Sequence, residues 1–327
     1  MATNDTTLYP ADLTQNVVKL GPLVGASRVS KHLFNQIRAY AQTDYPVLIT
    51  GESGTGKELV AQTVHSLSLR RKSTFIPVNC GSLGSALAGS ELFGHVRGAF
   101  TGADRSRKGA FSAANGGTLF LDEFGELTHS VQATLLRALE TGEIRAVGAD
   151  SNSRTNIRLI CATNVDLWSA ANRGDFRDDL LFRVDVLRLH IPPLRDRLSD
   201  LDALVPHLLE RLKDRPQIDP AGIQVLKTYH WPGNVRELRN VLTRCAIRAG
   251  AYRQIEGEHV ADVLMCIQAR SPSLPLHTDP NFRTQTFETV SRRLRENGGD
   301  RRRTYQSLGI PRSTFYRWLR EGKVVDR

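Results

Sequence analysis

The residues best suited to chemistry form a glycine-rich octapeptide after a short apolar run: Gly51, Glu52, Ser53, Gly54, Thr55, Gly56, Lys57 and Glu58. Its three glycines let the backbone turn tightly enough for N–H groups to surround phosphate oxygens. Lys57 adds a positive charge at the start of the helix-compatible stretch that follows. The octapeptide therefore predicts a site that binds a nucleotide through its phosphates. The alternative is a flexible glycine loop without a ligand.

A pair of acidic residues follows another apolar run. Residues 119–121 read as the core of a buried strand, and they deliver Asp122 and Glu123 to the edge where the octapeptide lies. We expect Asp122 to help place Mg²⁺ and Glu123 to orient or deprotonate the attacking water. Glu58 stands where a phosphate loop usually has Ser or Thr, so metal ligation would depend more on Asp122 and water. The alternative for the pair is a solvated strand end.

The elements that must position these residues alternate along the chain. Apolar runs bounded by turn residues occupy 45–50, 75–80, 118–122, 158–163 and 186–191, and longer helix-compatible stretches separate them. This alternation predicts an α/β fold, in which helices cover a parallel sheet. Nucleotides bind such sheets beyond the carboxyl ends of the strands, which is where Gly51, Asp122 and Asn164 fall.

Beyond Pro192 and Pro193 the pattern becomes helical and predicts a lid. A leucine stripe runs through 201–212 around Pro206, which should kink the helix, and Asn234 with Glu237 forms a capping signature for a further helix. Three prolines and no periodicity mark a linker. We therefore expect a short lead over 1–22, an α/β subdomain over 23–193, a helical lid over 194–268, a linker over 269–282 and a small all-helical domain over 283–327.

A hexapeptide lies between the octapeptide and the acidic pair, where a plain helix would be ordinary: Gly98, Ala99, Phe100, Thr101, Gly102 and Ala103. It places an apolar tip and a hydroxyl between two glycine hinges, a shape suited to gripping another protein. Phe100 has no reason to be exposed unless it packs on a partner. The alternative is a Phe100 ring buried in the core of its own domain. A second segment, 141–148, could lever this loop.

Four motifs in this order resemble the sigma-54-dependent transcription activators, also called bacterial enhancer-binding proteins. They are the octapeptide, the stretch 91–95 (Glu-Leu-Phe-Gly-His) with the hexapeptide, the stretch 116–123 ending in the acidic pair, and the stretch 231–238 (Trp-Pro-Gly-Asn-Val-Arg-Glu-Leu). The resemblance runs from about residue 22 to the C-terminus and implies an AAA+ P-loop ATPase with ATP and Mg²⁺ as cofactors. A glutamate at Glu58 is typical of this family. The hexapeptide, by the same resemblance, contacts the sigma-54 subunit of RNA polymerase holoenzyme.

The resemblance also implies roles for residues near the nucleotide. Asn79 would hold the catalytic glutamate back until a partner is engaged, although it could merely satisfy a turn. Thr163 and Asn164 resemble the first sensor of the γ-phosphate, and Asn164 could also cap a helix beginning near Val165. Arg236 resembles the second sensor, which bridges lid and nucleotide, the alternative being a solvent-facing arginine.

Two further arginines, Arg177 and Arg183, lie where the family carries arginines that reach a neighbouring subunit's nucleotide. Such a residue stabilises charge on the transferred phosphoryl group and can contribute about 10³–10⁵ in rate. The alternative is surface pairing with Asp178, Asp179 or Asp185. If both act on a neighbour, a ring is required for turnover. By family analogy it is a hexamer, assembled directly or through dimers, from one chain or with a related subunit.

The C-terminal segment is strongly basic and resembles a Fis-type helix-turn-helix. Residues 281–327 hold 12 Lys and Arg against 5 Asp and Glu, so they supply +7 of the chain's net charge of +10. Phe287, Val290, Leu294, Phe315, Trp318 and Leu319 fall on inward faces. We expect Arg301, Arg302 and Arg303 to touch DNA phosphates, and Arg312, Ser313, Thr314, Tyr316 and Arg317 to face the major groove. The alternative is a basic scaffold that binds no DNA.

Composition bounds the compartment. The four cysteines form no Cys-x-x-Cys pair, which favours a reduced protein over a disulfide or zinc framework. Neither a signal peptide nor an apolar run of about 18 residues is apparent, so we expect a cytoplasmic protein without a membrane partner. The 22 residues before the α/β subdomain are too few for a sensing domain, so control is expected from a separate protein, from expression or from ring assembly.

These observations lead to one preferred function and two alternatives. The preferred function is an activator that binds enhancer DNA, assembles into an ATPase ring and remodels sigma-54 holoenzyme so that the promoter opens. A DNA-binding repressor with a vestigial ATPase is disfavoured by the intact hexapeptide and acidic pair. A general AAA+ remodeller of other proteins is disfavoured by the basic C-terminal segment.

Overall fold

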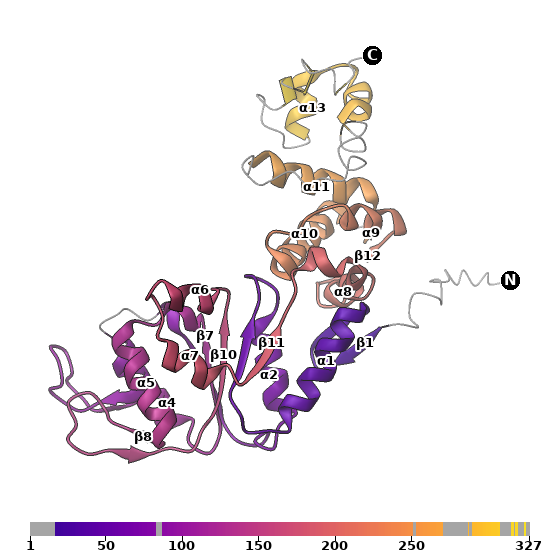
Figure 1. The fold of residues 1–327 in the computed structure, drawn as a ribbon. Helices are drawn as coiled ribbons and strands as arrows, with labels where there is room; N and C mark the ends of the chain where they lie inside the picture. Colours follow the sequence, from indigo (N-terminus) through magenta and orange to yellow (C-terminus); the bar gives the residue numbers. More distant parts are fainter. Residues whose placement is uncertain are drawn as a thin grey trace. The chain divides into compact units, whose positions relative to one another are not determined.

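The structure is a computed structural model that describes residues 17–82, 87–250, 253–270, 287, 290–307, 315–316, 318–319 and 324. Its fold is drawn in Figure 1. The chain divides into two compact units. The first comprises residues 19–23 and 28–193, and the described part of the second comprises residues 17–18 and 24–27 and those from 194 onward.

A parallel sheet of five strands organises the first unit. The strands are β3 (Val47–Thr50), β4 (Phe75–Asn79), β7 (Thr118–Asp122), β10 (Arg158–Thr163) and β11 (Leu187–His190). Their order is β11-β3-β10-β7-β4, and every neighbouring pair is parallel. Each predicted apolar run therefore forms a strand, and the α/β fold is confirmed. Strand β3 begins later than predicted, after Pro46, which has no N–H to donate to the ladder.

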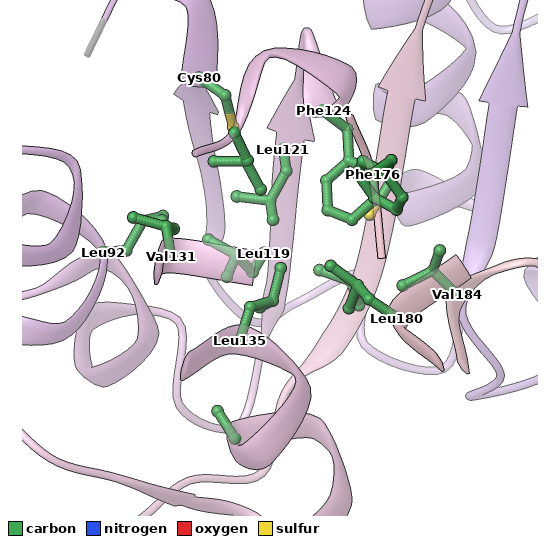
Figure 2. Close-up of a cluster of buried hydrophobic side chains, with 14 of the residues drawn as sticks. Cys80, Leu92, Leu119, Leu121, Phe124, Val131, Leu135, Phe176, Leu180 and Val184 are labelled. Carbon is green, nitrogen blue, oxygen red and sulfur yellow. The ribbon is translucent and has the colours of Figure 1, made fainter. Parts of the chain in front are cut away.

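Helices cover both faces of this sheet, because successive residues of a strand point to opposite sides. Leu119 and Leu121 of β7 belong to a buried cluster with side chains of α5 (His129–Thr141) and α7 (Asp178–Val184), shown in Figure 2. Phe120, between them, stacks on Phe75 at a ring-centroid distance of 5.8 Å, and Phe75 contacts His65 of α2 (Lys57–Ser66). The alternation explains why the strand is apolar throughout.

The remaining helices of the first unit are α1 (Arg28–Ala41), α3 (Ala88–Phe93), α4 (Ala110–Ala113) and α6 (Leu167–Asn172). A buried arginine fixes α1 to the sheet: Arg158 of β10 donates hydrogen bonds to the carbonyl oxygens of Tyr40 and Ala41, at 2.7 and 3.1 Å. Two short pairs of strands project from this unit, β5 (Gly94–His95) with β6 (Arg107–Lys108) and β8 (Glu143–Ile144) with β9 (Ser153–Arg154).

The second unit is mainly helical. It contains α8 (Leu201–Leu209), α9 (Pro220–Lys227), α10 (Asn234–Ala249) and α11 (Gly257–Arg270), with a short parallel pair, β12 (Gln217–Ile218) and β13 (Gln254–Ile255). Trp231 is fully buried among leucines of α8, α9 and α10, and its indole N–H donates to the carbonyl of Leu226 at 2.9 Å. Pro206 lies inside α8, which ends three residues later.

The predicted cap of α10 is wrong in one respect. Asn234 begins the helix with a φ of 51°, and its side-chain oxygen accepts a hydrogen bond from the N–H of Leu194 at 2.7 Å instead of capping the first turn. That N–H is buried and needs an acceptor, so a tertiary contact takes precedence over the local one. Glu237 does reach back, because its carboxylate accepts the N–H of Gly233 at 2.8 Å.

The C-terminal residues of the second unit include a helical stretch over 290–296 and α13 (Arg301–Ser307). Val290, Leu294 and Phe315 are buried in one cluster with Met265 of α11, which agrees with the inward faces predicted for them. Two strands near the start of the chain, β1 (Val18–Leu20) and β2 (Leu23–Gly25), pair with each other. Among the described residues, none of the helices has the length and apolar character needed to span a bilayer.

Candidate nucleotide site and hexapeptide hairpin

Four adjacent strands of the sheet end at one edge, and each is followed by predicted site residues. The register pairs Thr50 with Thr163 and Asp122 with Asn79, so the ends of β3, β10, β7 and β4 are nearly level. The octapeptide follows β3 and Asn164 follows β10. Since neighbouring strands lie about 5 Å apart, this edge brings together side chains that are far apart in sequence. The structure thus collects the predicted nucleotide residues of the first unit.

The octapeptide loop has the conformation that phosphate binding requires. Gly51, Gly54 and Gly56 all have positive φ, and a Cβ on Gly51 would lie 2.7 Å from the carbonyl oxygen of Ile191. The loop is anchored by a hydrogen bond from the N–H of Gly51 to the carbonyl of Thr163. Lys57, at the start of α2, donates through Nζ to the carbonyl oxygens of Gly51 and Glu52 at 2.8 and 3.1 Å. The ammonium therefore lies over the loop, where phosphate oxygens could replace the carbonyl oxygens.

The other side chains of the octapeptide divide between the inside and the outside of the loop. Thr55 is buried, and its hydroxyl donates to the carbonyl of Glu52 at 2.8 Å. Ser53 and Glu58 are exposed. The carboxylate of Glu58 accepts a hydrogen bond from Gln62 one turn further along α2, at 3.2 Å. Glu58 therefore lies along the exposed side of α2, which leaves the backbone and Lys57 to supply phosphate contacts.

The acidic pair lies at the end of β7 in an unusual backbone conformation. Glu123 has a φ of 53°, in the left-handed region, and its N–H donates to the carboxylate of Asp122 at 3.0 Å. A Cβ built on Gly81 would lie 2.0 Å from Oε2 of Glu123 and 3.4 Å from Oδ1 of Asn79. The Glu123 carboxylate thus reaches across to the turn after β4, beside Asn79. No pattern in the sequence marks Gly81 as a neighbour of Glu123.

Asn79 also stabilises that turn. Its side-chain oxygen accepts the N–H of Ser82 at 3.0 Å, and its carbonyl accepts the Ser82 hydroxyl at 2.8 Å. The buried thiol of Cys80 follows, and burial, with the negative charges of Asp122 and Glu123 as smaller causes, raises its pKa to about 12. A thiolate at this position would be disfavoured, so Cys80 serves in packing.

The donor set at this edge fits a nucleotide with a hard cation. Nowhere in the described stretches do three His, Cys, Asp or Glu side chains gather to hold a metal ion. A divalent cation near Asp122 would therefore take most of its ligands from nucleotide phosphates and water, which is how Mg²⁺ is commonly held. Asp122 remains the predicted protein ligand.

Asn164 is exposed directly after β10, at the same edge. It does not cap the next helix: the cap of α6 is Asp166, whose carboxylate accepts the N–H groups of Trp168 and Ser169 at 3.1 and 3.3 Å. The alternative role of Asn164 as a cap is therefore wrong. Thr163 is buried, and its hydroxyl oxygen accepts the N–H of Val165 at 3.0 Å, which turns the chain away from the strand.

The hexapeptide forms the tip of an antiparallel hairpin over residues 94–108, here called the hexapeptide hairpin. Strands β5 and β6 pair Gly94 with Lys108 and His95 with Arg107. The tip is closed by hydrogen bonds from the N–H of Gly98 to the carbonyl of Ala103 and from the N–H of Ala103 to the carbonyl of Phe100, at 2.9 and 3.0 Å. Thr101 and Gly102 are exposed, whereas Ala103 is buried.

Phe100 packs on the strand of its own hairpin. Its ring is half-buried and packs edge-on against His95, with ring centroids 5.1 Å apart. Nδ1 of His95 in turn lies 2.6 Å from the hydroxyl of Ser90 on α3. The alternative of a ring buried in the domain core is therefore wrong, and the predicted contact with a partner stays a prediction. The ring rests on the hairpin that carries it.

A second hairpin, residues 143–154, is joined to the first. Val147 forms a bridge with His95: its N–H donates to the carbonyl of Gly94 at 2.8 Å, and its carbonyl accepts the N–H of Val96 at 3.1 Å. A Cβ on Gly148 would lie 2.8 Å from Cβ of Ala99. The segment predicted to lever the hexapeptide therefore contacts it directly.

Comparison with known proteins assigns this arrangement to a family. The "Sigma-54 interaction domain" family matches residues 23–190, half of the chain, and an "AAA+ ATPase lid domain" family matches residues 195–274. The chain belongs to the sigma-54-dependent transcription activators. Its first unit thus carries the AAA+ P-loop NTPase fold of these activators, and the family resemblance drawn from the motifs is confirmed.

Related activators cover most of the chain. The Nif-specific regulatory protein of Azotobacter vinelandii is 41% identical over 306 residues, which is 90% of this chain and 58% of the relative. The transcriptional regulatory protein ZraR of Escherichia coli K12 is 37% identical over 301 residues, 90% of this chain and 67% of ZraR. The chain spans 59% and 58% of the length of the Nif-specific regulatory proteins of Enterobacter agglomerans and Azotobacter vinelandii.

Among solved structures, NtrX from Brucella abortus in complex with ADP superposes with a TM-score of 0.68 at 29% identity. The match covers 93% of this chain and 69% of NtrX. NtrX has also been solved in complex with ATP, and that structure superposes with a TM-score of 0.67. A solved neighbour of similar fold therefore binds adenine nucleotides.

The two arginines predicted to act on a neighbour have partners within their own unit. Arg177, at the start of α7, donates through Nε and Nη2 to the carboxylate of Asp179 at 3.0 and 2.6 Å. Arg183 donates through Nη2 to the carbonyl of Leu139 at 2.8 Å. The surface pair suggested for Arg177 thus exists, and the pKa of Asp179 is lowered chiefly by its hydrogen bond with Arg177.

The remaining predicted residues belong to the second unit. Arg236 is exposed on the first turn of α10. Arg301, Arg302 and Arg303 are exposed on α13. Tyr316 is predicted to face outward, but it is half-buried and its ring packs against Phe315, 6.0 Å away. Four predicted base-contact residues lie outside the described residues: Arg312, Ser313, Thr314 and Arg317.

Proposed function

We propose that this chain is an ATP-driven transcription activator: it binds enhancer DNA, assembles into an oligomeric ring, and uses ATP hydrolysis to remodel sigma-54 RNA polymerase holoenzyme until the promoter opens. The observation that carries the proposal is the hexapeptide hairpin, which projects from the same compact unit as the nucleotide edge. A hydrolase that only turned over ATP would gain nothing from such a projection. A machine that pushes on a partner needs one.

The chemistry would be divided among residues at the sheet edge. The octapeptide N–H groups and Lys57 would hold phosphates, and Asp122 would help to place Mg²⁺, which would supply charge neutralisation when bound. Glu123 would accept a proton from the attacking water. Asn164 and Arg236 would sense the nucleotide from the sheet and the lid. Arg177 and Arg183 of a neighbouring copy would complete the site, which makes a ring necessary.

Coupling to the hairpin would run along the chain after β4. Glu123 lies beside Gly81 and Asn79, and the same segment leads through α3 into β5. If Glu123 leaves this position to act on water, the turn after β4 loses a close neighbour, and α3 with the hexapeptide hairpin can shift. Asn79 would then regulate when the carboxylate is released. The partner gripped by Phe100 and Thr101 would be the sigma-54 subunit.

The DNA contact is proposed for the C-terminal domain. Arg301, Arg302 and Arg303 are exposed on one short helix, and three adjacent guanidinium groups are suited to phosphate oxygens. Such contacts would hold the protein on DNA without reading its sequence. Sequence reading is assigned to Arg312, Ser313, Thr314, Tyr316 and Arg317, although the half-buried ring of Tyr316 leaves it less available than the sequence suggested.

The substitution Thr101→Ala tests the proposal. The exposed hydroxyl at the hairpin tip is lost while the phosphate edge is untouched, so hydrolysis should persist, whereas sigma-54 binding and open-complex formation should disappear. Thr134→Ala, which removes another exposed hydroxyl on α5, is the matched control and should leave all three intact. Normal activation by Thr101→Ala, or equal activation in cells that lack sigma-54, would overturn the proposal.

A further inference from the structure

One pair of facing residues in the hexapeptide hairpin is fixed to α3 on both strands. His95 and Arg107 lie opposite each other in the β5–β6 pair. Nδ1 of His95 lies 2.6 Å from the hydroxyl of Ser90, which is buried on α3. The guanidinium of Arg107 donates to the carboxylate of Glu91, the next residue of that helix. Because two consecutive residues of α3 hold two facing residues of the hairpin, a shift of α3 carries this part of the hairpin with it.

The same histidine supports the aromatic ring of the tip. Phe100 packs edge-on against His95 with ring centroids 5.1 Å apart and ring planes at 63°, a favourable geometry for an aromatic pair. The backbone of His95 is held as well, because Val147 forms hydrogen bonds with Gly94 and Val96 on either side of it. His95 therefore connects three parts of the unit: α3, the second hairpin and the tip of the hexapeptide hairpin.

The space around the tip is open. Gly98 and Gly102, which flank the ring in sequence, have φ of 80° and 95°, and a Cβ on either would have no neighbour within 4 Å. Phe100 can therefore leave His95 without displacing other groups. In its present position the ring is half-buried and offers a partner only part of its surface. A partner that binds the whole ring must compete with His95 for it, and the lost contact reduces the net affinity.

We propose that His95 is a positioning residue that holds Phe100 back on the hairpin, and that Ser90 orients the His95 ring, so that the position of α3 determines how readily Phe100 is released to sigma-54. This inference rests on the proposed function, because it takes sigma-54 as the partner of Phe100. It adds a residue outside the hexapeptide that regulates the binding of that partner. An aromatic pair of this kind opposes release by a factor of about two to ten in affinity.

His95→Asn in the full chain tests the inference. Asparagine keeps a hydrogen-bonding atom near the place of Nδ1 for Ser90, but it removes the ring on which Phe100 packs. The affinity for labelled sigma-54 is measured by fluorescence anisotropy with and without a non-hydrolysable Mg-ATP analogue, together with ATPase activity. We expect the affinity without nucleotide to rise about two- to tenfold, and the gain in affinity from nucleotide to shrink by the same factor. ATPase activity should change by less than about twofold, because the phosphate loop and the acidic pair are untouched.

Three further variants separate the ring from its surroundings. His95→Phe keeps a ring for Phe100 but loses the hydrogen bond to α3, and Ser90→Ala removes the other partner of that bond. Both should raise the affinity without nucleotide by less than His95→Asn does. Ser106→Ala is the matched control, because the Ser106 hydroxyl oxygen accepts the N–H of Arg97 at 3.0 Å within the same hairpin. It removes one hairpin contact without altering the aromatic pair, so it should leave the affinity within about twofold.

The direction of the change decides the outcome. A variant that only damaged the hairpin would bind sigma-54 more weakly, so tighter binding by His95→Asn supports release of Phe100. Unchanged or weaker binding by His95→Asn, or a larger rise in His95→Phe, would overturn this inference alone, provided that the unmodified chain binds sigma-54. An equal rise in Ser106→Ala would also reject it, because general loosening of the hairpin would then explain the effect. If the unmodified chain does not bind sigma-54 under either condition, the proposed function fails as well.

Discussion

The base of the hexapeptide hairpin gives a prediction whose size follows from the structure. Gly109 has an extended backbone (φ −82°, ψ 171°) that any residue can adopt, so replacing it changes only the space it occupies. A Cβ there would lie 2.2 Å from the nitrogen of Gly94, 2.4 Å from the carbonyl carbon of Phe93 and 2.5 Å from the carbonyl oxygen of Leu92. All three are backbone atoms, which cannot rotate aside.

In Gly109→Ala, β6 must therefore move away from the end of α3 by about 1 Å before the methyl reaches an ordinary contact distance. Overpacking of this kind costs about 1–3 kcal/mol, and each kcal/mol lowers the melting temperature of a domain of this size by about 2–4 °C. The same shift strains the bridge between His95 and Val147. We expect the affinity for sigma-54 to fall by about tenfold or more, whereas ATPase activity should change by less than about twofold because the sheet edge is not involved.

A control variant with a similar loss of folding stability distinguishes an effect on stability from an effect on sigma-54 binding. Gly174→Ala introduces a side chain at φ 77° with no atom within 4 Å, so it costs about 1–2 kcal/mol in backbone strain without displacing the hairpin. Both variants should melt at lower temperature by differential scanning fluorimetry, but only Gly109→Ala should lose sigma-54 in a fluorescence anisotropy titration. Unaltered melting and unaltered affinity in Gly109→Ala would show that the packing argument is mistaken.

Three further predictions concern the scaffold. The carboxylate of Asp200 is fully buried and accepts two backbone N–H groups, so Asp200→Asn should destabilise the second unit by about 3–5 kcal/mol. The control Asp202→Asn breaks a more exposed ion pair and should cost less than about 1 kcal/mol, and equal melting temperatures of the two variants would contradict the prediction. Burial and, as a smaller cause, a nearby arginine lower the pKa of His65, so below pH 6.5 the unfolded state binds more protons than the folded state and stability should fall on acidification. His65→Gln should flatten this dependence of stability on pH. An unchanged pH dependence would show that His65 is not its source. A thiol reagent at pH 8 should label half-exposed Cys266 in the native protein and spare buried Cys80, whose pKa is raised to about 12. Peptide mass spectrometry would measure the labelling of each cysteine. Equally fast labelling of both would refute the burial argument.

The sheet and its edge can be predicted from the sequence because they depend on local patterns. Apolar runs bounded by turn residues mark strands, and the carboxyl ends of parallel strands must meet at one edge, so the sequence alone places Gly51, Asp122 and Asn164 together. The order of the strands adds that Asn79 lies level with Asp122, which follows from the pairing of β4 with β7. That pairing joins segments about 40 residues apart, and no local pattern encodes it.

Sequence prediction fails where a tertiary contact or an unusual backbone angle takes precedence over a local preference. Local pattern makes Asn234 the cap of its helix, but with positive φ it turns to the buried N–H of Leu194. Glu123 and Gly81 are neighbours only because the chain after β4 folds back over the end of β7. The glycines around Phe100 suggest exposure, while the ring's partner, His95, lies on the strand below. Each case depends on three-dimensional proximity that spacing in the sequence does not specify.

The proposed catalytic groups share one property in a single copy of the chain: each already contacts a group of that same copy. Lys57 lies on loop carbonyl oxygens, Arg177 on Asp179, Arg183 on the carbonyl of Leu139, and Glu123 beside Gly81. The Arg177–Asp179 pair is largely exposed and screened by solvent, so a neighbour's phosphate would displace Asp179 at little cost. The Arg177–Asp179 pair therefore does little to restrain Arg177 in its resting position.

The stronger restraints lie elsewhere. Glu123 has a left-handed backbone that costs about 1–2 kcal/mol and must be maintained by its surroundings, and Val147 ties the two hairpins together by two backbone hydrogen bonds. In the proposed cycle, the free energy of ATP hydrolysis therefore serves mainly to move Glu123 and the two hairpins, and the arginines rearrange at little cost. Substitutions at Asp179 should then leave the nucleotide dependence of sigma-54 binding nearly unchanged. Gly148→Ala, which would place a methyl 2.8 Å from Cβ of Ala99, should alter it, even though Gly148 belongs to neither the octapeptide nor the hexapeptide.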